Sequence, residues 1–176
     1  MPTLARSAVA VPHSRIRELA EIAMGMDGVL KLYFGESNVP TPEYVKRAAI
    51  KAMQDGFTFY TENAGLPSTR RALARHYQEL HGVELDPERE IVVTASGVQA
   101  LNVSIRCVLD PGDEALLLTP AWPNATSMVA MSNATPVEIP QPLEGDRYVV
   151  DFDALERAVT DRTRLLVYTS PSNPLG

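Results

Sequence analysis

Four short apolar runs alternate with helix-like segments in the second half of the chain, and this alternation constrains the fold most strongly. The runs cover residues 91–93, 115–118, 136–139 and 165–168, with helical patterns between them. Strands that are apolar on both faces need cover on both faces, which is typical of parallel sheets with helical connections. The sequence therefore predicts an α/β fold with a three-layer, mostly parallel sheet.

Helices are also expected before and between these runs. Apolar residues recur at helical spacing over residues 14–24, 41–55 and 67–81, and a glycine follows each segment. In the second segment, Thr41 is placed to cap the helix ahead of Pro42. The helical patterns between the runs would form the layers that cover the sheet.

Charge and composition disfavour several function classes. Sixteen Lys and Arg against twenty-two Asp and Glu give a net charge of −6, which disfavours general binding to nucleic acid or anionic membranes. The uncharged stretch 115–137 contains too many prolines and polar residues for a membrane-spanning helix, which needs about 20 mainly apolar residues. No apolar run near the N-terminus is long enough for a signal peptide. We therefore expect a globular chain with no nucleic-acid or membrane partner.

The single cysteine, Cys107, excludes an internal disulfide and a cysteine-cluster metal site. It lies within the apolar stretch 103–109 and is therefore expected to be a small buried residue. No metal site is predicted. A chain without disulfides fits the reducing cytoplasm, which is the expected location.

Residues with binding chemistry follow three of the four runs, at the strand ends where parallel sheets bind their ligands. Ser96, Gly97 and Val98 open a helix, and amides at a helix start suit an anion such as phosphate. Trp122 follows the second run, and Asn173 stands between two prolines after the fourth. From the residues alone, each position also has a plainer interpretation: a strand-to-helix turn, a core indole and a simple turn.

Taken in order, these motifs resemble the class I/II aminotransferase family of fold-type I pyridoxal-phosphate enzymes. The resemblance covers nearly the whole chain and rests on residues 32–42, 60–74, 92–114 and 170–176. The last segment looks like the family's Ser-Pro-x-Asn-Pro-Thr-Gly turn, with Leu175 in place of the threonine. The resemblance implies the large-domain sheet of these enzymes, preceded by an N-terminal arm and small-domain segment.

A site for pyridoxal 5′-phosphate is implied by the same resemblance. The amides and hydroxyl around Ser96, Gly97 and Val98 would hold the cofactor phosphate. Trp122 would stack on the pyridine ring, and Asn173 would hydrogen-bond to the phenolic oxygen of the ring.

Two further site residues are implied in the first half of the chain. Tyr60 would reach the phosphate of a neighbouring subunit's cofactor, which implies a homodimer with shared active sites. Gly35 would offer its backbone to the substrate carboxylate, and the implied substrates are an amino acid and a 2-oxo acid. Asn38, Val39 and Thr69 depart from the common pattern, so the resemblance leaves the identity of the amino acid open.

The catalytic lysine of the family has no counterpart in this sequence. In the family a lysine forms a Schiff base with the cofactor and moves the substrate proton, but this chain has only Lys31, Lys46 and Lys51, none in the lysine motif. The acid that pairs with the pyridine nitrogen and the arginine that grips the substrate are missing too. No catalytic residue is therefore assigned, and the chain is expected to be an inactive N-terminal portion that ends at the Asn-Pro-x-Gly turn.

The resemblance also implies a domain division and leaves alternatives open. Residues 1–40 would form the arm and part of a small domain, and residues 41–176 the first part of the cofactor-binding large domain. One alternative is a carbon–sulfur β-lyase on the same fold, which would release pyruvate and ammonia from cysteine-type substrates. Another class is a non-catalytic sensor or scaffold, although no basic helix-turn-helix segment precedes residue 14.

Overall fold

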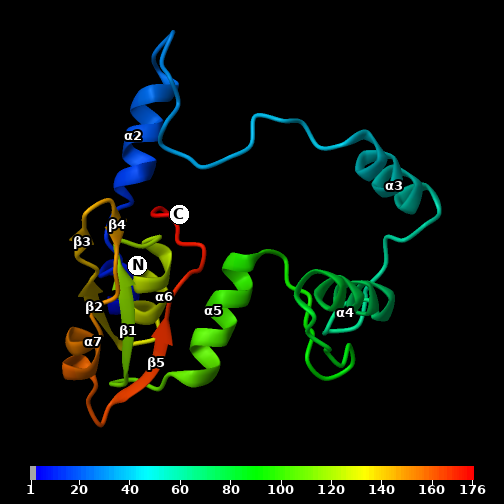
Figure 1. Cartoon of the computed structure of the whole chain (residues 1–176). Helices are drawn as coiled ribbons and strands as arrows, with labels where there is room; N and C mark the ends of the chain where they lie inside the picture. The colour runs from blue at the N-terminus through cyan, green and yellow to red at the C-terminus, as the bar shows by residue number, and fades with distance from the viewer. Residues whose placement is uncertain (1–2) are drawn as a thin grey trace. The chain divides into compact units, whose positions relative to one another are not determined.

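A computed structural model describes residues 3–176, which divide into two compact units (Figure 1). The sheet unit contains the described residues up to Arg15 together with residues 96–176, and the helical unit contains residues 16–95. The expected domain boundary at residue 40 lies inside the helical unit and stays a prediction. Each unit is described by itself below.

Three parallel strands form the main sheet of the sheet unit, in the order β2-β1-β5. They are β1 (Glu114–Thr119), β2 (Thr135–Pro140) and β5 (Thr163–Val167). The central strand β1 pairs with both neighbours, and its first four residues are buried. The predicted parallel sheet is therefore confirmed, and its most apolar run forms the strand with the most cover.

Helices connect these strands and cover the sheet. The helix α6 (Asn124–Met131) joins β1 to β2, and α7 (Phe152–Ala158) joins β2 to β5. These two crossovers run in opposite directions across the sheet, so the right-handed rule places α6 and α7 on opposite faces. The helix α5 (Gly97–Val108) packs against α6 and β5. This arrangement agrees with the α/β architecture expected from the alternating pattern.

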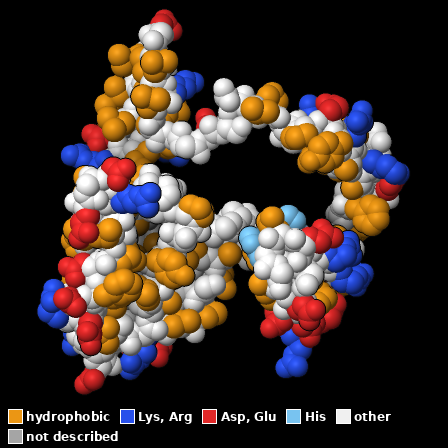
Figure 2. Space-filling model, viewed as in Figure 1, with side chains coloured by type: hydrophobic (Ala, Val, Ile, Leu, Met, Phe, Trp, Pro, Cys, Tyr) orange, Lys and Arg blue, Asp and Glu red, His pale blue; other side chains and the backbone are white. Residues whose placement is uncertain are grey.

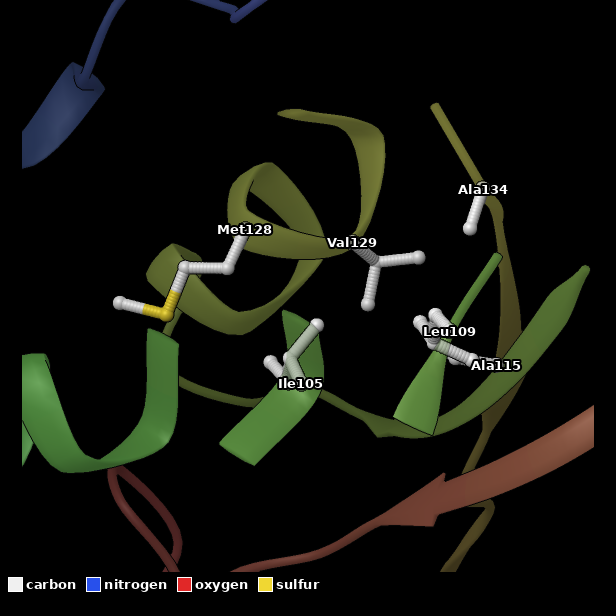
Figure 3. Packing of buried hydrophobic residues seen from close by; sticks show 6 residues of the cluster. All are labelled: Ile105, Leu109, Ala115, Met128, Val129 and Ala134. Carbon is white, nitrogen blue, oxygen red and sulfur yellow. The ribbon is translucent and has the colours of Figure 1, made fainter. Parts of the chain in front are cut away.

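The core of the sheet unit lies between α5, β1 and α6 (Figure 3). It consists of Ile105, Leu109, Ala115, Met128, Val129 and Ala134. Ile105 and Leu109 are four residues apart and therefore belong to the same face of α5 and its C-terminal cap. This face joins the helix to the sheet.

Cys107 is exposed, so the expectation of a buried cysteine was wrong. It stands two residues from both Ile105 and Leu109, and a step of two residues turns to the opposite side of a helix. An apolar stretch of helix therefore does not by itself show which residues face the core.

Two small elements of the sheet unit were not expected. A short helix, α1 (Arg6–Val9), contacts α6. A two-stranded antiparallel hairpin, β3 (Leu143–Glu144) and β4 (Arg147–Tyr148), follows β2. Its four residues are too few to give a recognisable alternating pattern.

The helical unit contains the three helices expected in the first half of the chain. They are α2 (Arg15–Met24), α3 (Glu43–Gln54) and α4 (Pro67–His81). Thr41 does not cap α3 as expected, because Pro42 occupies the N-cap position and no side chain caps the helix there. Within residues 3–176, no helix is long and apolar enough to cross a membrane.

Residues 91–93 form no strand, which corrects the prediction of a first strand there. The amide of Val93 donates to the carbonyl of Ala64 (2.9 Å), but no strand of the described chain pairs with this segment. Val92 is 67% exposed. An apolar run becomes a strand only where a neighbour offers a ladder of backbone hydrogen bonds, and none is available here.

The backbone approaches itself closely at Gly65. This residue has a φ of +92°, and a Cβ added to it would lie 2.6 Å from the Cβ of Val93. Only glycine adopts this conformation readily and also leaves room for the valine. The contact fixes the segment after Ala64 against the segment that carries Val93.

A buried arginine clamps the same region. Arg70 of α4 is 4% exposed, and its Nε donates to the carbonyl of Gly65 (3.2 Å). Its Nη1 donates to the carbonyl of Pro87 (2.5 Å), and its Nη2 lies 3.0 Å from Oε2 of Glu88. A buried charge is tolerated only when such partners replace water, so this Arg70 clamp joins α4 to two turns.

Glu114 ties the start of β1 to the turn before β5. Its carboxylate accepts hydrogen bonds from Oγ1 of Thr160 (2.6 Å) and from Nε of Arg162 (2.9 Å), and it also pairs with Nη2 of Arg162. Its backbone amide donates to the carbonyl of Arg162 (2.9 Å). The Thr160 hydroxyl and the Arg162 guanidinium hold the pKa of Glu114 below its ordinary value. This network lies at the amino ends of the strands, away from the edge where ligands of such sheets bind.

We expect Glu114→Gln to lower the free energy of unfolding at neutral pH, because an amide does not replace the paired carboxylate. A lowered folded-state pKa stabilises the fold above the ordinary carboxyl range, near pH ~4.3. This stabilisation is lost as the pH falls through that range towards the folded-state pKa. Urea unfolding at several pH values from 7 to 3 should show the difference from wild type shrinking at acid pH. Glu144→Gln, on the exposed strand β3, is the control and should leave the neutral-pH midpoint nearly unchanged.

Gly65→Ala should destabilise the chain by about 2 kcal/mol or more, because it combines an unfavourable φ with a collision against Val93. Gly28→Ala is the matched control, since Gly28 also has a positive φ but has nothing within 4 Å of the added Cβ. This control should cost about 1 kcal/mol from the backbone alone. Equal losses in the two variants, measured by chemical denaturation, would contradict the proposed close approach.

Candidate functional site

Five of the seven predicted site residues belong to the sheet unit, and all five lie at or near the end of a helix or strand. Ser96, Gly97 and Val98 stand at the start of α5, Trp122 follows β1, and Asn173 follows β5. In Figure 1 the start of α5 and the C-terminal turn lie at the end of the sheet towards which β5 points. This is the carboxyl edge, where parallel sheets bind ligands.

The start of α5 provides an anion-binding geometry. Ser96 is the N-cap, and its Oγ accepts a hydrogen bond from the amide of Gln99 (3.2 Å). The first intrahelical bond runs from the amide of Ala100 to the carbonyl of Ser96 (3.1 Å), so the amides of Gly97 and Val98 precede the helical ladder. A Cβ added at Gly97 would meet nothing within 4 Å. Exposed amides, open space and the positive end of a helix suit a phosphate.

The position of Trp122 is compatible both with packing in the core and with stacking on a ligand ring. It is half-buried and packs against the hydrophobic cluster between α5 and α6. This contact steadies the indole, and its accessible part can meet a flat ring.

Asn173 lies in a tight turn after β5. The amide of Gly176 donates to the carbonyl of Ser172 (2.9 Å), and Asn173 stands between Pro171 and Pro174, whose rings fix their φ angles. The side chain of Asn173 is exposed and offers both a donor and an acceptor. The turn therefore presents a polar group whose backbone is restrained.

A pocket of about 300 Å³ lies at the same edge of the sheet. Its walls come from four places: the end of β1 and the loop after it, the residue after β2, the segment before α7, and the segment after β5. The lining residues are Leu118, Ala121, Gln141, Val150, Tyr168, Thr169, Ser170, Pro171, Ser172 and Gly176. Its volume is at the lower end of the range for small-molecule sites. Trp122 and Asn173 adjoin lining residues in the chain, although they are not themselves part of the wall.

Gln141 was missed by the sequence reasoning, which looked for binding groups after three of the four apolar runs only. The signal was present, because a polar residue follows the third run after a single proline. Its backbone amide donates to the backbone carbonyl of Thr119 (2.7 Å), so this hydrogen bond joins the ends of β2 and β1. Arg70 and Glu114 were also missed, because their roles depend on distant partners.

Tyr60 and Gly35 belong to the helical unit. The side chain of Tyr60 is fully exposed, and a Cβ added at Gly35 would meet nothing within 4 Å. Both positions are therefore accessible, and their relation to the other five residues stays a prediction.

The lysines of the chain all belong to the helical unit. Lys46 pairs with Glu43 (2.7 Å) and Lys51 with Asp55 (2.7 Å) on the exposed helix α3. Lys31 is exposed. The sheet unit therefore contains no lysine.

Comparisons with known proteins agree with the resemblance. The family described as aminotransferase class I and II matches residues 27–176. A probable aspartate/prephenate aminotransferase of Thermus aquaticus is 40% identical over 171 residues, which cover 97% of this chain and 43% of the relative. An aspartate aminotransferase of Pyrococcus abyssi is 36% identical, over 93% of this chain and 42% of the relative. The chain thus spans less than half the length of these relatives.

Solved structures show the same fold. The N-succinyldiaminopimelate aminotransferase of Mycobacterium tuberculosis matches with a TM-score of 0.91 and 31% identity, over 98% of this chain and 44% of that one. A single mutant of the Thermus thermophilus aspartate aminotransferase matches with a TM-score of 0.89 and 37% identity, over 99% and 46%. Because the family match extends over most of its length, the chain belongs to the class I and II aminotransferase family.

Proposed function

We propose that this chain carries part of the cofactor site of a pyridoxal-phosphate-dependent aminotransferase, which moves an amino group from an amino acid to a 2-oxo acid. The main support is chemical. In this family member, one unit with a parallel sheet contains a helix start, an aromatic ring after β1 and a side-chain amide in the turn after β5. They match the three parts of the cofactor: a phosphate, a flat ring and a phenolic oxygen.

Each group has a separate task in this proposal. The amides of Gly97 and Val98 and the hydroxyl of Ser96 bind the phosphate, since a helix start favours negative charge. Trp122 covers one face of the ring and excludes water from it, and Asn173 orients the ring through its phenolic oxygen. When bound, the cofactor supplies an electron sink for the reaction at the substrate Cα.

The helical unit would contribute to substrate binding and to assembly. The hydroxyl of Tyr60 would donate a hydrogen bond to the cofactor phosphate held by a second copy of the chain, so the enzyme would be a homodimer with shared active sites. Its full exposure within this chain supports that role. Gly35 would present its backbone to the substrate carboxylate, and its open surroundings leave room for one.

We propose that the chain is inactive by itself. The reaction needs a base that moves a proton at the substrate Cα, and lysine is the residue the family uses for this step. Here Lys46 and Lys51 form ion pairs on α3, and the sheet unit contains no lysine. The β-lyase alternative uses the same cofactor groups, but the relatives compared above are all named aminotransferases.

The single tryptophan makes cofactor binding directly measurable. Addition of pyridoxal phosphate should quench the fluorescence of Trp122, and pyridoxal without the phosphate should bind more weakly. Ser96→Ala should weaken pyridoxal phosphate about 10-fold, because a hydrogen bond to a charged group contributes about 1.5–3 kcal/mol. Ser96→Thr keeps both the hydroxyl and the helix cap and should retain most of the affinity.

Ser104→Ala is the control for this titration, because Ser104 is an exposed serine further along the same helix. It should bind like the wild type. If pyridoxal phosphate and pyridoxal quench equally, or if Ser96→Ala has no effect, the phosphate is not held at the start of α5.

Activity provides a second prediction. With pyridoxal phosphate, aspartate and 2-oxoglutarate, the chain alone should give no transamination, detected as oxaloacetate by coupled oxidation of NADH. Addition of the separately produced C-terminal portion of the Thermus aquaticus relative should provide the lysine and give a measurable rate. Turnover by the chain alone would overturn its proposed inactivity, and pyruvate and ammonia release from cysteine would indicate the lyase instead.

A further inference from the structure

A second pocket of the sheet unit lies between the β3–β4 hairpin and the C-terminal turn. It has a volume of about 340 Å³, which is at the lower end of the range for small-molecule sites. We call it the hairpin pocket. Its walls come from the residue after β2, from the hairpin with its turn, and from the last residues of the turn after β5. None of the residues proposed to bind pyridoxal phosphate lines it, so its purpose is separate from theirs.

Backbone hydrogen bonds hold both walls of the hairpin pocket. The amide of Val149 donates to the carbonyl of Pro142 (3.0 Å), which closes the base of the hairpin. On the other wall, the amide of Gly176 donates to the carbonyl of Ser172 (2.9 Å). In Figure 1 the hairpin and the C-terminal turn lie at the same end of the sheet unit. The pocket is therefore formed before a ligand arrives, which lowers the cost of binding.

One carboxylate and one guanidinium line this pocket. They belong to Asp146 and Arg147, in the turn and second strand of the hairpin. Within residues 3–176 neither side chain forms an ion pair, with the other or with any third residue. In Figure 2, basic and acidic side chains both reach the surface over the hairpin. Two opposite charges in one pocket suit a ligand that carries both an ammonium and a carboxylate group.

Leu175 gives the opposite wall an apolar character. It is half-buried and lines the pocket beside Ser172. This is the position at which the motif of the family has a threonine, so a branched apolar side chain replaces a hydroxyl here. The ring of Tyr148 adds further apolar surface from the hairpin. The pocket therefore suits a ligand whose uncharged part is apolar.

We propose that the hairpin pocket binds a free α-amino acid with an apolar side chain. Arg147 binds the carboxylate of the ligand, Asp146 binds its ammonium group, and Leu175 contacts its side chain. The ligand is held by this chain alone and requires no pyridoxal phosphate. The site is thus additional to the proposed cofactor site and does not depend on it.

The test titrates the isotope-labelled chain with L-leucine, without pyridoxal phosphate, and follows the backbone amide signals by NMR. The amides of Gly145, Arg147 and Gly176 should shift along one common saturation curve. Three analogues each lack one part of leucine: isocaproate lacks the ammonium group, isoamylamine lacks the carboxylate, and glycine lacks the side chain. Each analogue should bind about 10-fold more weakly than leucine, because one wall of the pocket loses its partner.

Variants assign the three walls separately. Arg147→Gln and Asp146→Asn should each weaken leucine about 10-fold, because each removes one charge and keeps a similar shape. Leu175→Thr introduces the residue of the family motif and should weaken leucine about threefold without changing the binding of glycine.

Two substitutions on α7 are the matched controls. Arg157→Gln and Asp153→Asn remove the same charges from exposed residues that do not line the pocket. Both variants should bind leucine like the wild type.

Three outcomes would overturn the proposal. The first is an absence of amide shifts at the hairpin in a chain whose circular dichroism shows that it is folded. The second is binding of isocaproate or isoamylamine as tightly as leucine, and the third is equal weakening by Arg147→Gln and Arg157→Gln. Because no cofactor is present, a failure of the proposed cofactor site would leave these results unchanged.

Discussion

The pairing of β1 on both sides is the interaction on which the rest of the sheet unit depends. β1 forms hydrogen bonds with β2 and β5, and its first four residues are buried on both faces. The contacts at its amino and carboxyl ends therefore position the turns at both ends of the sheet. At the amino end, Glu114 holds the turn before β5 through Thr160 and Arg162. At the carboxyl end, the chain leaves towards Trp122, and the amide of Gln141 is bound by the carbonyl of Thr119. The Glu114 network and the candidate site therefore lie at opposite ends of the same central strand.

The helical unit is organised around a different kind of interaction. It buries little apolar surface, and its central contacts are polar or steric: the Arg70 clamp and the approach of Gly65 to Val93. Its helices expose many apolar side chains, including Leu19 and Ile22 on α2. Figure 2 shows apolar side chains at the surface of this helix. Such exposure is typical of surfaces that become covered in an assembly.

Much of the fold and of the candidate site could be predicted from the sequence, because both depend on local patterns. Helix boundaries follow from prolines and glycines such as Pro67 and Gly82, whose backbone preferences are intrinsic. The positions of Ser96, Trp122 and Asn173 after apolar runs indicated the candidate site, and Gln141 could have been added to it by the same rule. Predictions failed where the conformation of a segment depends on a partner that is distant in the sequence. Residues 91–93 form no strand, because no strand of the described chain pairs with them.

The sequence by itself determined the alternation of strands and helices, the motifs of the family and the position of all three lysines in the first half of the chain. Only the tertiary structure decided that Cys107 faces solvent, that Arg70 is buried, and that β5 pairs on one side only within residues 3–176. The physical reason is the range of the forces involved. Backbone preference and hydrophobic periodicity act between near neighbours in the chain, whereas burial, ion pairing and strand pairing join residues that only folding brings together.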